Sequence, residues 1–128
     1  MPEMTDSLEN SILNAILRNT SYTSPSNVYL GLLGTAATDS TSGTELTNTG
    51  YARQGLTFAA PSAGVAATSA SVTWSNSSGS DWDVAVQVGI YDASTGGNLL
   101  FYKNIAGRLV KDGESLTIDS GALTVTLD

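Results

Sequence analysis

The stretch VAVQVGIYDASTGGNLLFYKNI, residues 84–105, decides the fold. Every second residue from 84 to 90 is Val or Ile, and smaller or polar residues lie between them, which is the pattern of a half-buried strand. Residues 98–105 are a second apolar strand candidate. The link between the two, residues 92–97, contains two glycines that are free to adopt the positive φ of a tight turn. The stretch therefore predicts an antiparallel β-hairpin.

Further strand candidates lie on both sides of this hairpin. They are short, apolar and β-branched, and stretches rich in Gly, Ser and Thr separate them, such as the loop 35–50 and the turn at Asp112-Gly113. The strands of the hairpin extend over residues 84–92 and 98–105, and the other candidates are residues 27–33, 52–59, 69–74, 115–118 and 123–127. Seven short strands at near-regular spacing predict an antiparallel β-sandwich.

Residues 5–19 are expected to form an amphipathic α-helix. Asp6 is its expected N-cap, and Glu9 is the other half of a pair that resembles a capping box. Large apolar residues recur at helical spacing and form one stripe: Leu8, Ile12, Leu13, Ile16 and Leu17. We expect this stripe to pack onto the chain's own sheet, and packing against another subunit is the alternative.

The length of 128 residues fits a single domain, with the helix at 5–19 and the strands within 27–128. With seven expected strands and one expected helix, the chain is expected to be mainly β.

The charged residues of the chain make up 13%, against about 25% in average soluble proteins. Ser and Thr take their place and suit a surface that lies against neighbouring proteins. The net charge of −7, with five scattered basic residues, argues against binding to nucleic acid or to an anionic membrane surface.

The residue types that support catalysis are scarce. The chain contains no His and no Cys, which removes the commonest general base and the thiol nucleophile. Asp81 and Asp83 flank a tryptophan and would need further converging oxygens to bind Ca²⁺, so they are interpreted as two solvated acids. We expect no enzymatic activity, no catalytic residue, no cofactor and no metal. The N-terminus lacks a basic signal-peptide region, and no run of 18 apolar residues occurs, so secretion by the general route is not expected.

Several motifs of the chain together resemble a known protein family. They lie within residues 15–33, 44–54, 89–102 and 113–125, and they include SYTSPSNVYLGLL, GYARQ and GIYDASTGGNLLFY. These motifs are similar to those of small structural proteins of tailed-bacteriophage virions, which are labelled tail fibre proteins in many phages and capsid cement proteins in some. The resemblance spans nearly the whole chain. It implies a non-enzymatic virion protein that assembles in the cytoplasm of the host bacterium.

The resemblance leaves the place in the virion open. A compact, acidic chain without shaft repeats favours a capsid cement (decoration) protein on the outer capsid surface, where it would bind and stabilise the shell of the major capsid protein. A tail-fibre or tail-tip component involved in host attachment is the alternative, with a glycan as one candidate ligand.

Four residues are candidates for contacts with partners: Tyr22, Tyr51, Arg53 and Trp82. They lie in expected loops or at strand ends, where Tyr, Trp and Arg often anchor protein interfaces. Local packing that orders the loops is the alternative for each of them. The expected partners are the major capsid protein and further copies of the chain, with a homotrimer as the expected assembly.

Overall fold

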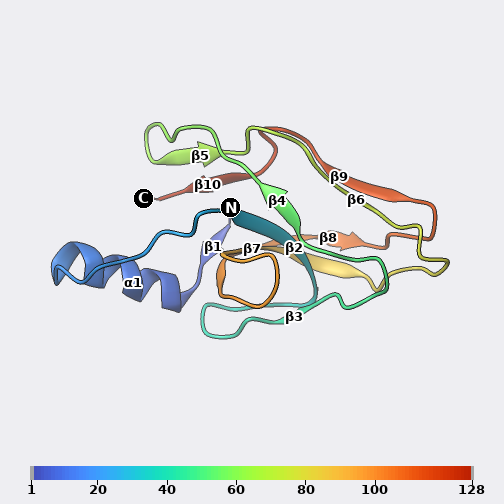
Figure 1. The fold of residues 1–128 in the computed structure, drawn as a ribbon, viewed down its shortest axis with the longest axis horizontal. Helices are drawn as coiled ribbons and strands as arrows, with labels where there is room; N and C mark the ends of the chain where they lie inside the picture. Colours follow the sequence, from blue (N-terminus) through green and yellow to red (C-terminus); the bar gives the residue numbers. More distant parts are fainter. Residues whose placement is uncertain (1, 128) are drawn as a thin grey trace.

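The computed structural model describes residues 2–127 of the chain. Within that range it is mainly β, with antiparallel strands and a single helix, as the sequence predicted. Figure 1 shows the arrangement. In chain order the elements are β1 (Glu3–Met4), α1 (Asp6–Leu17), β2 (Val28–Thr35), β3 (Thr44–Glu45), β4 (Gln54–Leu56), β5 (Val65–Ala67), β6 (Val72–Ser75), β7 (Ala85–Tyr91), β8 (Leu99–Arg108), β9 (Ser115–Ile118) and β10 (Thr124–Thr126).

The largest sheet is built around the predicted hairpin. Its strand order is β1-β8-β7-β2-β3. Strand β4 pairs with residues 28–30 of β2, on the same edge of β2 where β3 pairs with Leu33 and Thr35. Strands β7 and β8 are antiparallel, and the link between them contains Gly96 and Gly97 at φ values of 62° and 68°. The hairpin is thus confirmed, together with the positive φ of both glycines.

Two short ribbons, β5–β10 and β6–β9, form a second layer over one face of this sheet (Figure 1). The core between the layers combines Leu30, Leu32, Val88 and Ile90 of the sheet with residues of the ribbons and their loops, which are Val72, Trp74, Trp82, Val110 and Leu123. The arrangement is sandwich-like. Because both tryptophans fill this space, the two layers share one core.

Strand β7 differs from its expected half-buried pattern, because both of its faces are covered. Val88 and Ile90 face the ribbons, while Tyr91 belongs to a smaller cluster with Leu33 and Leu99 on the other side of the sheet. A register shift between Ala85 and Gln87 also places Ala85 in the main core and leaves Val84 exposed. The alternation of residues 84–90 was therefore a correct signal for a strand and a wrong one for its burial.

The polar residue on β7 is satisfied within the chain. Gln87 is buried, and its side chain accepts a hydrogen bond from the Ala37 amide at 2.6 Å and donates to the Ala37 carbonyl and to Asn104 Oδ1. These bonds attach the 36–43 loop to the sheet. Sequence patterns did not predict β1, β3 and β5, because these strands of two or three residues lie in stretches without an alternation of apolar and polar residues.

Candidate functional site: the helical arm and the Glu45–Arg53 cluster

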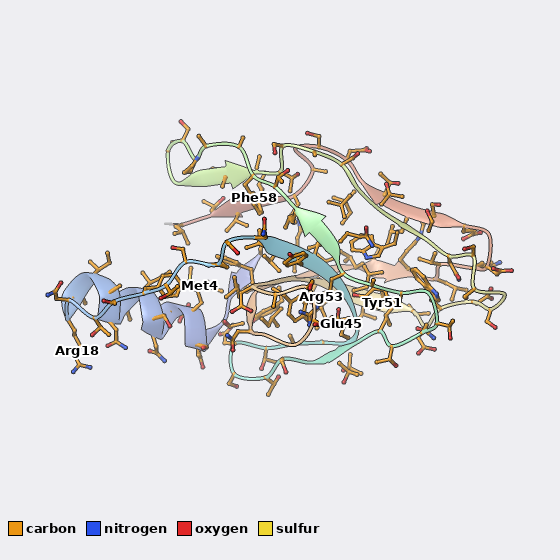
Figure 2. The ribbon with its side chains drawn as sticks, in the orientation of Figure 1. Met4, Arg18, Glu45, Tyr51, Arg53 and Phe58 are labelled. Atoms are coloured by element: carbon orange, nitrogen blue, oxygen red, sulfur yellow. The ribbon has the colours of Figure 1, made fainter. Side chains whose placement is uncertain are left out.

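Helix α1 projects from the β layers as an arm (Figure 1). Its base is anchored through Thr5, whose amide donates to the Leu100 carbonyl at 3.0 Å and whose hydroxyl donates to the Leu99 carbonyl at 2.9 Å. Leu8, one turn further on, is buried. In Figure 2 Met4 lies next to the sheet, whereas Arg18 marks the far end of the arm.

The predicted cap at Asp6 is wrong. The helix begins at Asp6 itself, and the N-cap is Thr5, which has extended backbone angles and no side-chain bond to the helix. Its hydroxyl is engaged by β8 instead. At the other end the amides of Arg18 and Thr20 both donate to the Asn14 carbonyl, and Asn19 has a left-handed φ of 51°. Asn tolerates this conformation, which ends the helix and turns the chain back.

The apolar stripe of the helix is only partly covered. Leu13, Ile16 and Leu17 have exposed fractions of 53%, 76% and 74%. The expectation that the stripe packs onto the chain's own sheet is therefore correct only near Leu8, because the helix leaves the body after its first turns. Large apolar side chains gathered on one exposed face of a monomer are characteristic of an interaction surface.

A groove lies beside the base of the arm, between α1, the N-terminal strand and the C-terminal residues. It has a volume of about 460 Å³. Its walls include Met4, Ile12, Leu13, Phe101 and Leu127. Glu3 and Glu9 also line it. The groove and the exposed part of the stripe share Leu13, so they form one continuous surface, which we call the arm surface (Met4, Ile12, Leu13, Ile16, Leu17, Phe101 and Leu127).

A second cluster of functional groups lies at the edge of the sheet, around Glu45 and Arg53 (Figure 2). The Arg53 guanidinium donates to both Glu45 oxygens, at 2.8–3.1 Å, and lies 3.5 Å from the centre of the Tyr91 ring. It also donates to the carbonyls of Ala93 and Gly96 in the β7–β8 link. The cluster thereby ties the hairpin link to the β2 edge of the sheet.

Tyr51 completes this cluster. Its hydroxyl donates to Glu45 at 2.7 Å and accepts from the Leu32 amide at 2.8 Å, and its ring meets Trp82 edge-on at 5.7 Å. Gly31 provides the space, since a Cβ at that position would lie 2.8 Å from Glu45 Oε1 and 3.1 Å from the Tyr51 hydroxyl. A glycine inside a strand is a known sign of such a close approach.

Burial and charge shift the proton affinities of the cluster. Burial raises the pKa of Tyr51, and the Glu45 carboxylate adds to the rise. Burial, with the charge of Glu45, raises the pKa of Tyr91 to about 12. Burial opposes the charge of Arg53, but the hydrogen bonds and charge of Glu45 raise the pKa of its guanidinium. At neutral pH the cluster therefore holds one fixed ion pair between neutral phenols. The ion pair and its hydrogen bonds support the fold.

The four predicted contact residues lie in different environments. Tyr22 is exposed and lines a hollow of about 250 Å³ between α1 and the β7–β8 link. Tyr51 and Arg53 belong to the Glu45–Arg53 cluster described above. Trp82 is 2% exposed, and its indole N–H donates to the Thr49 carbonyl at 2.9 Å. In the single chain, Tyr51, Arg53 and Trp82 therefore show the alternative to a partner contact, which is local packing. Tyr22 is the one of the four with an exposed side chain.

Three of the aromatic side chains are buried and are therefore not available to bind a glycan. Trp74 is 1% exposed, and its indole N–H donates to the Ala52 carbonyl at 3.1 Å. Trp82 and Tyr91 are buried as well. These three rings therefore present no open face on which a sugar could stack.

Sequence reasoning missed two parts of the candidate site. It did not pair Glu45 with Arg53, although Gly31 inside an apolar strand was a signal that another group approaches there. It named the apolar helix stripe but could not tell which of its residues remain exposed. Leu127 joins the groove only because the C-terminal segment pairs back along β5.

Among residues 2–127, no three His, Cys, Asp or Glu side chains are grouped so that they could hold a metal ion. Asp81 instead accepts a hydrogen bond from the Asp112 amide at 3.0 Å. No helix in the described range has the length and apolar character needed to cross a membrane.

Comparison with known protein families gives a match over nearly the whole chain. The family model described as "Podophage GP4 fiber I protein gp80" matches residues 3–126, which includes the arm, both layers and the Glu45–Arg53 cluster. No curated protein matches the chain at a significant level.

Proposed function

The chain belongs to the family of the Podophage GP4 fiber I protein gp80, a family of tailed-phage virion structural proteins, and we propose that it is a non-enzymatic fibre component. The observation that carries this proposal is the contrast between a closed body and an open arm. The body satisfies its buried polar groups within the chain, since no buried side-chain N or O atom of the described residues lacks a hydrogen-bond partner. The arm surface leaves large apolar groups uncovered.

This contrast suits a protein that is held in the particle by one element. The tip of the arm adds little to the core of the β body, because the Ile16 and Leu17 side chains are about three-quarters exposed. Covering these side chains would then add about 25 cal/mol per Å² of apolar surface removed from water. A fibre component joined to its neighbours through the arm makes use of this free energy. The description of the matching family as a fiber protein supports a fibre role.

Capsid cement protein is the second candidate. It is supported by the compact sandwich-like body, by the absence of shaft repeats in the sequence and by the net charge of −7, which could steer the chain to a basic shell. In this role the partner would be the major capsid protein on the outer capsid surface.

Counting and locating the chain in purified particles tests both roles. A fibre component is expected in low copy number, with density at the tail or its fibres in cryo-electron microscopy. A copy number that approaches that of the major capsid protein, with density over the shell, would replace the fibre proposal with the cement proposal. Absence of the chain from particles would contradict both.

The arm is tested separately in the same particles. Phage that encodes Ile16→Asp together with Leu17→Asp should assemble particles that lack the chain, whereas Val84→Asp, at an exposed apolar residue of the β body, should leave incorporation unchanged. Normal incorporation of the double variant would show that another surface attaches the protein.

A further inference from the structure

We propose that the partner of the arm surface is a second copy of this chain, and that two arms pack antiparallel around a two-fold axis near Leu13. This inference deepens the proposed function and rests on it for the use of the arm as a contact. It names the partner from three properties of the described residues: the position of the ridge and the groove, the charges at the two ends of the helix, and the amount of exposed apolar surface.

The ridge and the groove lie on the same helix, one after the other. Ile16 and Leu17 form a ridge at the tip, and the groove beside Glu9, Ile12 and Leu13 lies toward the base. A two-fold axis across the helix near Leu13 turns the tip of one copy toward the base of the other. Each ridge then enters the groove of the other copy, and the same contact forms twice, as an isologous interface requires.

The charges at the ends of the arm favour the antiparallel direction. The first turn carries Asp6 and Glu9, and the helix is followed by Arg18. Antiparallel arms bring the acidic end of one copy toward the basic end of the other, and such charges attract each other over a screening distance of about 8–10 Å at physiological salt. Parallel arms would place acidic ends together and basic ends together. A parallel bundle of three arms is disfavoured for the same reason.

The exposed apolar surface has the character of an interface that is covered in the assembled state. Leu13, Ile16, Leu17 and Leu127 are each more than half exposed, and they lie along one surface with the groove. Monomeric proteins rarely expose apolar patches beyond a few hundred Å². A pair of arms, each seated in the other's groove, removes these side chains from water without changing either body.

The mass of the isolated chain in solution is the first test. Light scattering at increasing concentration should show a transition from one chain to two. Ile16→Asp with Leu17→Asp should give one chain at every concentration, and Val84→Asp, at an exposed apolar residue of the β body, should behave as the unsubstituted protein. Circular dichroism should be the same for all of them, because the changed residues are exposed. A mass of three chains would overturn the two-fold arrangement.

The direction of the arms is tested by disulfide formation, which the absence of Cys in the natural chain makes unambiguous. Residues 9 and 17 are equally far from an axis at Leu13. Chains with Glu9→Cys mixed with chains with Leu17→Cys should therefore form mixed disulfides, and neither should form disulfides with its own kind. Disulfides formed only within one kind would show parallel arms and overturn the proposal.

A failure of this inference can be told apart from a failure of the proposed function. If the isolated chain is monomeric at all concentrations while Ile16→Asp with Leu17→Asp still prevents incorporation into particles, the arm binds a different virion protein and the second copy is excluded. The fibre role would then stand, because it depends on the position of the chain in the particle.

Discussion

At the scale of single residues, Arg53 makes the most connections. Its side chain is 8% exposed and binds Glu45, two carbonyls of the β7–β8 link and the face of Tyr91. These partners come from two separate segments of the chain, one at Glu45 and one at residues 91–96. A planar guanidinium can satisfy them together because its N–H groups point in fixed directions, whereas a lysine has one compact ammonium. Arg53 therefore closes the edge of the sheet by geometry as much as by charge.

The first prediction concerns this geometry. Arg53→Lys keeps the charge but loses the paired bonds to Glu45, so the free energy of unfolding should fall by about 1–3 kcal/mol. Urea denaturation measures the change. Arg18→Lys is the matched control, since Arg18 is exposed at the tip of the arm, and its effect should stay within about 0.5 kcal/mol. Equal effects of the two substitutions would mean that the cluster contributes nothing specific.

The second prediction separates two neighbouring glycines. Both have positive φ, but a Cβ at Gly97 would collide with Asp92 Oδ1 and lie 2.8 Å from Ala93 Cβ, whereas a Cβ at Gly96 would meet nothing within 4 Å. Gly96→Ala should cost about 1 kcal/mol of backbone strain, and Gly97→Ala roughly 2–4 kcal/mol because crowding is added. Thermal unfolding of both variants measures the difference. A Gly96→Ala variant less stable than Gly97→Ala would contradict this account of the link.

At the scale of elements, the hairpin and the helix differ in how they are held. The β7–β8 link is closed locally by Asp92, whose carboxylate accepts bonds from the Asn98 amide at 2.7 Å and from the Asn98 side chain at 2.9 Å. Helix α1 is held at its base by Thr5 and Leu8, and its last turns extend away from the body. The hairpin is thus specified by nearby residues, and the arm by contacts of its base with distant segments of the chain.

The third prediction uses the titration of Asp92. The Asn98 amide lowers the pKa of this carboxyl below its usual 3.8, against the opposing effect of burial. A pKa lowered in the folded state adds stability above pH 3.8, and this stability is lost as the pH falls through the folded pKa. Asp92→Asn should therefore be less stable than the unsubstituted protein at neutral pH, and the difference should shrink below pH 3.8.

Stability curves of the two proteins between neutral and strongly acidic pH provide the measurement. Asp83→Asn is a control at an exposed carboxylate outside the link. A difference between Asp92→Asn and the unsubstituted protein that persists unchanged in strong acid would show that the ionised carboxylate is not the cause.

The fourth prediction tests how the arm is anchored. Leu8 is buried and Leu17 is exposed, although both belong to the stripe of the same helix. Leu8→Ala should lower the free energy of unfolding by about 2–3 kcal/mol, and Leu17→Ala should change it by less than about 0.5 kcal/mol. Denaturation at a concentration where the chain is monomeric measures both. A large loss for Leu17→Ala would place the arm tip against the body.

At the scale of the whole molecule, the two layers depend on one core. Trp74 extends into it from β6 and Trp82 from the loop before β7, and each indole N–H is bonded to a carbonyl of the segment between β3 and β4. The sheet and the ribbons thus have their largest buried side chains in common. Domains of this size with a single core usually unfold in one step.

The fifth prediction follows from this shared core. Tryptophan emission of the native protein should have its maximum at short wavelength, and it should shift to longer wavelength in the same urea transition that removes the β signal in circular dichroism. The variant Trp82→Phe leaves Trp74 of β6 as the reporter of the ribbons. The variant Trp74→Phe leaves Trp82, in the loop before β7, as the reporter of the sheet. A ribbon signal from Trp74 that is lost well before the sheet signal would mean that the layers unfold independently.

The sequence by itself determined the features that depend on neighbouring residues. The 84–105 hairpin, the positive φ of Gly96 and Gly97, the helix near residues 5–19 and most strands follow from local periodicity and turn chemistry, which act over a few residues. The sequence also predicted a mainly β chain and, through its motifs, the virion protein family.

Only the tertiary structure decided which faces are covered. Residues 84–90 carry a half-buried pattern, yet β7 is buried on both sides because the ribbons and the 36–43 loop close over it. The helix stripe predicts burial, yet Ile16 and Leu17 remain exposed because no segment of the same chain covers that side of the tip of the arm. Burial depends on segments that are distant along the chain, and a local pattern contains no information about where those segments lie.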